Sequence, residues 1–172
     1  TWRGPDNGAR RSNGKAMKTP VARGGAAKRQ SSAQRRNAKP GSKPLWQGYL
    51  TFYKTAVTPE VTESTWVRLR DPAEPMHVLG AFLDGTLVGI VHFLFHRSTW
   101  TTGDYCYLQD LFTVPEARGQ GAGRALIQAV YERAEAAGAS RVYWLTHESN
   151  AVARGLYDTL AERPGFIQYR HL

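Results

Sequence analysis

Three glycines at alternate positions stand between an apolar stretch and a helical pattern: Gly119, Gly121 and Gly123. The apolar stretch ends at Val114-Pro115, and residues 121–137 predict a helix with one apolar face. Glycines at such a junction leave backbone N–H groups uncovered at a helix N-terminus, where they can bind phosphate oxygens. The alternative is a tight turn that only requires positive φ. The flanking Arg118 and Arg124 favour phosphate binding, because arginine adds charge-assisted hydrogen bonds.

The chain from Leu45 onward alternates between helical and strand patterns. Helices are predicted at residues 45–53, 60–70, 121–137 and 149–162. Two strands within residues 76–100 are joined by Asp84-Gly85, and further strands are predicted at 104–114, 141–146 and 166–172. A hairpin followed by strand–helix–strand–helix–strand predicts a mixed α/β (α+β) fold, with a mostly antiparallel sheet flanked by helices.

Residues 1–44 differ sharply in composition from residues 45–172. They hold 12 Lys or Arg and one acid, and no Leu, Ile or Phe, whereas the rest of the chain holds 11 Lys or Arg and 13 acids. A segment of this kind buries too little apolar surface to offset its ordering entropy, so a disordered basic tail is expected. Such a tail can bind nucleic acid through phosphates, but a solvated appendage is the favoured interpretation. Residues 45–172 are predicted to form one folded domain.

The remaining composition excludes several classes of protein. The single cysteine, Cys106, rules out a disulfide framework and fits a reducing, cytoplasmic environment. No run approaches the 18 or so apolar residues of a membrane span, so no membrane partner is expected. Cys106 has no histidine at short spacing, which argues against a thiol nucleophile. No metal site is predicted.

Two familiar phosphate-binding motifs do not fit the glycine group. A P-loop closes on Gly-Lys-Ser/Thr, whereas Gly123 is followed by Arg124-Ala125. A dinucleotide fingerprint places its glycines directly after the strand, whereas residues 115–118 intervene here. One feature still supports a dinucleotide-binding site: Glu148 follows the next predicted strand, where an acid that binds the ribose can lie.

The stretch RGQGAG, residues 118–123, resembles the Arg/Gln-x-x-Gly-x-Gly/Ala pyrophosphate loop of the GNAT superfamily of acetyl-CoA-dependent N-acetyltransferases. The resemblance extends to YLQDLFTVPEARGQGAGRAL, residues 107–126, which is similar to the family's fourth strand and third helix. It also covers VYWLTHESNAVARGLYDTL, residues 142–160, with the pattern Asn-x-x-Ala-x-x-Leu-Tyr. The match runs from about Leu45 to the C-terminus, so residues 45–172 are identified as a GNAT domain, most similar to small histone- and polyamine-type members.

The resemblance implies which residues bind acetyl-CoA. The backbone of Phe112, Thr113 and Val114 is expected to hydrogen-bond the pantetheine arm. The pyrophosphate is expected at the N–H groups of Arg118, Gly119, Gln120, Gly121, Ala122, Gly123 and Arg124. Asn150 is expected either to bond the pantetheine or to cap its helix. Tyr157, on the same helix face, is expected to protonate the leaving thiolate, although core packing alone is an alternative.

The acceptor side departs from the family pattern. The family often has Glu as the base on the fourth strand where this chain has Gln109, which cannot accept a proton. The duty then passes to Asp110, to a water chain or to His147. Tyr53 and Trp144 are candidate walls of the acceptor slot, with core packing as the alternative. His92 and His96 alternate within an apolar strand and are interpreted as packing residues.

The implied activity is acetyl transfer from acetyl-CoA to a primary amine by direct attack in a ternary complex. The acceptor is a small amine, a polyamine or a peptide lysine. The competing interpretation is a non-catalytic GNAT-like domain that binds coenzyme A or regulates, which the Gln109 departure favours. The family also opens with a strand that residues 33–44 do not resemble. A missing strand leaves backbone groups unpaired, so a homodimer is expected.

The basic tail is expected to contribute nothing to acetyl-CoA binding. Deleting residues 1–40 should leave the dissociation constant within about twofold, measured by isothermal titration calorimetry. The reason is the change in composition at residue 44, which separates the excess positive charge from every large aliphatic side chain. A loss beyond about tenfold, or about 1.4 kcal/mol, would contradict this expectation.

Overall fold

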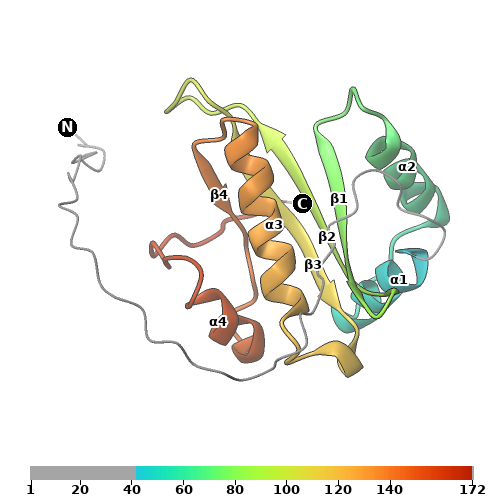
Figure 1. The fold of residues 1–172 in the computed structure, drawn as a ribbon. Helices are drawn as coiled ribbons and strands as arrows, with labels where there is room; N and C mark the ends of the chain where they lie inside the picture. Colours follow the sequence, from blue (N-terminus) through green and yellow to red (C-terminus); the bar gives the residue numbers. More distant parts are fainter. Residues whose placement is uncertain (1–41, 172) are drawn as a thin grey trace, which may run out of the picture.

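The fold is seen in a computed structural model that describes residues 42–171 (Figure 1). In chain order its elements are α1 (Lys43–Phe52), α2 (Pro59–Arg70), β1 (Met76–Leu83), β2 (Thr86–His96), β3 (Tyr105–Thr113), the 3-10 helix η2 (Pro115–Ala117), α3 (Ala122–Ala136), β4 (Arg141–Tyr143) and α4 (Ala151–Tyr157). Helix α1 begins slightly before the predicted domain boundary at Leu45. Residues 1–41 of the predicted basic tail lie outside the described residues.

The four strands form one sheet in the order β1-β2-β3-β4 (Figure 1). Strands β1, β2 and β3 pair antiparallel, and β4 pairs parallel to β3. A parallel neighbour needs a crossover connection, and α3 provides it between β3 and β4. The expected mixed fold with a mostly antiparallel sheet is therefore confirmed.

Helices cover both faces of the sheet, as two neighbouring residues of β2 show. Val91 is fully buried in the core cluster that contains Leu126 and Val130 of α3. The adjacent Ile90 belongs to a second cluster with Leu45 of α1 and Phe112 of β3. Successive side chains of a strand point to opposite faces, so α3 and α1 lie on opposite faces of the sheet.

Local signals in the sequence account for several element boundaries. The Thr58 hydroxyl accepts a hydrogen bond from the Val61 N–H at 3.4 Å and caps α2. Asp84 and Gly85 have φ of 48° and 77°, the left-handed pair that a two-residue hairpin turn requires. Gly138, with φ of 69°, follows the end of α3. These predicted features are confirmed.

The last predicted strand, residues 166–172, is wrong for the residues that the structure describes. Residues 162–171 form no helix or strand, and Phe166, Ile167 and Tyr169 are 83%, 75% and 88% exposed. Strand β4 is short, ends at Tyr143 and pairs with β3. An apolar pattern gives a strand only where a neighbouring strand can accept its backbone hydrogen bonds, and within the described chain this segment finds none.

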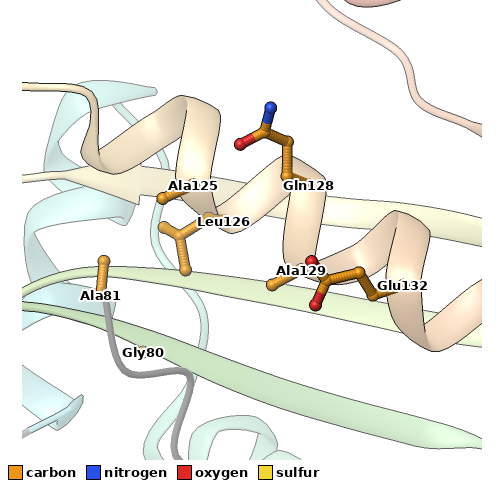
Figure 2. A pocket seen from close by; sticks show the side chains of 7 residues that line it. All are labelled: Gly80, Ala81, Ala125, Leu126, Gln128, Ala129 and Glu132. Atoms are coloured by element: carbon orange, nitrogen blue, oxygen red, sulfur yellow. The ribbon is translucent and has the colours of Figure 1, made fainter. Parts of the chain in front are cut away.

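A small cavity lies between β1 and α3, on the side of the sheet that α3 covers. Its lining includes the small residues Gly80 and Ala81 of β1 and Ala125 and Ala129 of α3. Leu126 points from the helix toward Ala81 across this space (Figure 2). The cavity has a volume of about 120 Å³, well below the roughly 300–1,000 Å³ of ligand pockets. It is a packing gap between small side chains and not a site for coenzyme A.

Candidate active site

Strands β3 and β4 pair only briefly and then separate. Their ladder ends with the pair Tyr107–Tyr143, and beyond it β3 continues to Thr113 with β2 as its partner. At the end of β3 the Val114 N–H donates to the Val88 carbonyl at 2.9 Å. Hydrogen-bonded pairs alternate along an antiparallel ladder, so the N–H and C=O of Thr113 point away from β2, toward the opening.

The open edge of β3 is where a pantetheine arm can add as a further strand. Of the three residues predicted for this contact, Thr113 offers its backbone, whereas the Val114 N–H is engaged with β2. Phe112 lies with its ring under α1, where a Cβ on Gly48 would be only 2.8 Å from it. The same alternation turns the N–H and C=O of Leu111 toward the opening, so Leu111 also offers its backbone there, which the sequence analysis does not include.

The glycine loop after β3 exposes the N-terminus of α3. Gly119 and Gly121 have φ of 73° and 85°, a conformation that residues with a Cβ rarely adopt. No side chain caps α3, and within the described chain the N–H groups of Ala122, Gly123 and Arg124 have no hydrogen-bond partner. These N–H groups and the helix dipole lie where the sequence predicts a phosphate site.

Side chains of this loop turn away from its backbone and brace it. The Gln120 amide donates to the Glu116 carbonyl at 2.9 Å. Arg124 donates to the Thr159 hydroxyl beyond α4 at 2.7 Å. The Arg118 guanidinium lies 5.4 Å from the ring centroid of Phe52, at the end of α1. The loop is thereby tied to α1 and to the end of α4. Two N–H groups predicted for the pyrophosphate are already bonded, because that of Arg118 donates to the Pro115 carbonyl at 3.2 Å and that of Gln120 to the Ala117 carbonyl at 3.4 Å.

A β-bulge at Gln109 decides which side chain of β3 faces α1. His92 pairs with Asp110 but the next residue, Phe93, pairs with Leu108, so Gln109 is left without a partner in the β2–β3 ladder. Leu108 lies in the core cluster under α3, whereas Asp110 contacts residues of the α1 face. The bulge therefore places Asp110 on the α1 side, and Gln109 is exposed to solvent.

Asp110 has two close neighbours from different elements. Its Oδ2 lies 3.0 Å from Nδ1 of His92, and the two side chains are 13% and 5% exposed. The Tyr49 hydroxyl of α1 lies close enough to the carboxylate to be influenced by it. Burial raises the pKa of Tyr49 well above its usual range, and the Asp110 charge raises it further. Tyr49 thus keeps its proton at neutral pH beside a nearly enclosed carboxylate.

Further tyrosines surround this carboxylate. Burial raises the pKa of Tyr53, and the Asp110 charge raises it further. The pKa of Tyr107 is raised by burial, by Tyr143 and by Asp110. The Tyr107 and Tyr143 rings stack with centroids 5.0 Å apart, at the point where β3 and β4 separate. One carboxylate among aromatic rings is the surface expected for an ammonium group.

Asn150 and Tyr157, at the two ends of α4, are both near Tyr53, the residue that follows α1. Asn150 occupies the N-cap position of α4 without capping it. Its amide instead donates to the Thr146 hydroxyl at 3.3 Å, and its proximity lowers the pKa of Tyr53 against the larger effects of burial and Asp110. Burial, followed by the influence of Tyr53, raises the pKa of Tyr157 to about 12. Tyr157 therefore keeps its proton at neutral pH, as a proton donor must.

The other two predicted acceptor residues lie elsewhere. The His147 ring is exposed and its Nδ1 lies 2.7 Å from the Ser149 hydroxyl, within its own loop. Trp144 packs against Tyr157 and Tyr131, with ring centroids 5.3 and 6.4 Å away, and supports the core from behind Tyr157. Within the part of the chain that the structure describes, neither side chain forms a hydrogen bond or an ion pair with Asp110.

Within the described residues, neither a reactive thiol nor a group of metal-ligating side chains is found at this site. Cys106 is completely buried, and burial raises the pKa of its thiol to about 12, so it does not ionise near neutral pH. Among residues 42–171 no three His, Cys, Asp or Glu side chains gather as metal ligands do. No helix of this range is long and apolar enough to cross a membrane.

Residues 43–161 match the model of the acetyltransferase (GNAT) family. The chain belongs to this family. It is 36% identical over 128 residues to the D-amino-acid N-acetyltransferase HPA3 of Saccharomyces cerevisiae, across 73% of this chain and 80% of that protein. It is 33% identical over 114 residues to the thialysine N-epsilon-acetyltransferase of Caenorhabditis elegans, across 62% of this chain and 71% of that protein.

Solved structures agree on the fold. The ribosomal-protein-alanine N-acetyltransferase of Brucella melitensis biovar Abortus 2308 superposes with a TM-score of 0.65 at 24% identity, over 77% of this chain and 90% of that one. The aminoglycoside acetyltransferase meta-AAC0020 from an uncultured soil sample gives 0.66 at 18% identity, over 83% and 95%. The predicted family, fold and enzyme class are confirmed: the chain is a GNAT N-acetyltransferase, and this family takes its acetyl group from acetyl-CoA.

Proposed function

We propose that this enzyme acetylates the amine of a small molecule that presents one ammonium group, and that donor and acceptor meet along β3. The observation that carries the proposal is the order of features on this one strand. Asp110 lies on its α1 face, the open backbone edge of Leu111 and Thr113 follows, and the uncovered N-terminus of α3 comes next. An acyl carrier bound along that edge presents its acetyl group beside Asp110.

The residues assigned to coenzyme A fit it through backbone N–H and C=O groups that have no partner within the described chain. The edge of β3 offers N–H and C=O groups to the amides of the pantetheine arm. The N–H groups of Ala122, Gly123 and Arg124 offer donors to the pyrophosphate at the positive end of α3. When bound, acetyl-CoA supplies a thioester carbon that an amine can attack directly, so no residue of this chain needs to carry the acetyl group.

Asp110 is assigned to the acceptor amine. Its carboxylate attracts the ammonium and takes the proton that must leave before the nitrogen can attack. The surrounding tyrosines contribute ring faces to the cation, each worth about 0.5–2 kcal/mol. Gln109 takes no part because it faces solvent at the bulge. The departure at Gln109 therefore gives no reason to propose a non-catalytic domain.

Support for small acceptors comes from the charge of the site and from the relatives. Asp110 is the one carboxylate that influences the tyrosines of the site, within the described chain. One carboxylate suits a single ammonium, whereas a polyamine offers several. Two relatives are named for D-amino acids and for thialysine, which are small amino acids. Thialysine has two ammonium groups, so these relatives support the small size of the acceptor and not its charge.

Acceptor profiling tests the proposed function. The purified chain is mixed with acetyl-CoA and, in turn, D- and L-amino acids, thialysine, spermidine, an aminoglycoside and a lysine peptide, and released thiol is followed. Amino acids are expected to give the highest kcat/KM. Preference for spermidine or the peptide would overturn the acceptor class, and absence of turnover with every amine would overturn the proposed function.

Tyr157→Phe is expected to lower kcat by about 10- to 100-fold, while affinity for acetyl-CoA barely changes. The variant removes the hydroxyl that is proposed to give its proton to the leaving thiolate, and it keeps the ring that packs on Trp144. Steady-state kinetics with the best amine measure the effect. Because the pKa of Tyr157 is raised to about 12, its ionisation should not limit activity below about pH 11.

Tyr131→Phe is the matched control for Tyr157→Phe. Tyr131 also packs against Trp144, and its hydroxyl donates to the Leu160 carbonyl at 3.1 Å. It loses a hydrogen bond in the core but none at the opening between β3 and β4. Its kcat should stay within about twofold of wild type. Equal kcat values for the two variants would make Tyr157 a packing residue.

A further inference from the structure

A histidine lies inside the sheet next to the proposed amine site. His92 of β2 is 4% exposed, and its Nδ1 lies 3.0 Å from Asp110 Oδ2 on the neighbouring strand. Most residues around it on this face of β2 and β3 are apolar, such as Ile90 and Phe112. A polar ring at such a position costs free energy unless its nitrogens are bonded.

Two tryptophans fix the orientation of this imidazole. The Trp46 ring of α1 and the Trp66 ring of α2 have centroids 5.4 and 5.8 Å from that of His92. Trp46 also stacks on Tyr49, with centroids 5.3 Å apart and planes 9° apart. His92 and Tyr49, the two side chains beside Asp110, are thus packed against the same indole. Their directions relative to the carboxylate are set by one rigid aromatic group.

The bond to Asp110 is the polar contact that this arrangement serves. Within the described chain the Nε2 of His92 has no hydrogen-bond partner, so the ring is only half satisfied. A leucine of similar volume would fill the same space without a buried unpaired nitrogen. The imidazole is therefore explained by what its Nδ1 does for Asp110 and not by packing.

We propose that His92 is a positioning residue for acetyl transfer: its Nδ1–H donates to Oδ2 of Asp110 and aims the carboxylate at the acceptor ammonium. With Oδ2 held by His92 and with Tyr49 of α1 beside it, the carboxylate cannot rotate freely, and its remaining lone pairs face the tyrosine-lined opening. His92 itself does not touch the substrate, because it is enclosed by Trp46 and Trp66. This inference rests on the proposed role of Asp110 in binding the amine.

Two substitutions separate positioning from packing. His92→Leu fills the volume but has no donor, whereas His92→Asn places an amide nitrogen at the position of Nδ1 but leaves a gap. A packing role predicts that His92→Leu keeps more activity, in line with its higher melting temperature. A positioning role predicts that His92→Asn is the more active variant, although His92→Leu still has the higher melting temperature.

We expect His92→Leu to raise KM for the amine and to lower kcat/KM by about 10- to 100-fold, with the dissociation constant of acetyl-CoA within about twofold of wild type. His92→Asn should be at least about fivefold more active than His92→Leu. Equal or higher kcat/KM in His92→Leu than in His92→Asn overturns the proposal. So does a loss of acetyl-CoA affinity in proportion to the loss of kcat/KM.

A spectroscopic test does not depend on turnover. Long-range ¹H–¹⁵N correlation spectra of the wild-type chain should show His92 with its proton on Nδ1, and Asp110→Ala should abolish this preference. A wild-type His92 protonated only on Nε2 overturns the proposal, whatever the enzyme's activity. If no amine is acetylated by the wild type, the proposed function fails by that result, and the tautomer still decides the His92–Asp110 bond.

Discussion

Gly121→Glu is expected to weaken acetyl-CoA binding by about 100-fold or more, which corresponds to about 2.7 kcal/mol. Gly121 is the N-cap of α3 with φ of 85°, and no neighbouring atom lies within 4 Å of the position that a Cβ would occupy. The new side chain therefore extends into the open space before the uncovered N–H groups. Its negative charge takes the place of the pyrophosphate at the positive end of the helix. Isothermal titration calorimetry with acetyl-CoA measures the loss.

Gly138→Glu is the matched control, because Gly138 also has positive φ, 69°, and open space around it, at the other end of α3. Both variants pay about 1–2 kcal/mol for a left-handed residue with a Cβ. A carboxylate is also more favourable at a helix N-terminus than at a C-terminus, so Gly138→Glu should melt lower. Gly121→Glu should therefore have the higher melting temperature of the two variants and yet the weaker affinity for acetyl-CoA. Equal binding by the two variants would mean that the loop serves the turn alone.

The fold could be predicted largely because its signals are local. The cap at Thr58, the turn at Asp84-Gly85 and the stop at Gly138 each depend on a few residues in sequence, and all three are present in the structure. The glycine loop belongs to the same class, since positive φ at Gly119 and Gly121 is a property of those residues.

The predicted final strand failed for the opposite reason. Residues 166–171 carry an apolar pattern, but a strand also requires a partner, and partners are a property of the whole sheet. The short β4 ends at Tyr143 and gives this segment no ladder within the described chain. Pattern alone could not reveal that.

The acceptor site was only half predictable because it depends on the bulge at Gln109. Strict alternation would place Tyr107 and Asp110 on opposite faces of the sheet. The extra residue brings them to the same face, where Tyr49 and His92 join them. No spacing rule in the sequence indicates a bulge, so the sequence analysis interprets His92 as a packing residue and gives Tyr49 no role beyond the predicted helix of residues 45–53.

Asp110→Asn is expected to lower kcat/KM for the amine by about 100- to 1,000-fold, within the range of a positioned acid–base group. Asparagine keeps the size of the side chain and an oxygen for the bond from His92, but it removes the charge that attracts the ammonium and the oxygen that takes its proton. Acetyl-CoA affinity should stay within about twofold. Asp158→Asn, at an exposed acid following α4, is the control for loss of a negative charge and should leave kcat/KM unchanged.

Gln109→Glu decides between the two neighbouring positions of β3. If the bulge directs residue 109 to solvent, a carboxylate there has no access to the amine. The double variant Gln109→Glu, Asp110→Asn should therefore be as inactive as Asp110→Asn, when kcat/KM is measured with the same amine. Recovery of activity in the double variant would place the base at residue 109, because only a glutamate that reaches the acceptor can replace the lost aspartate.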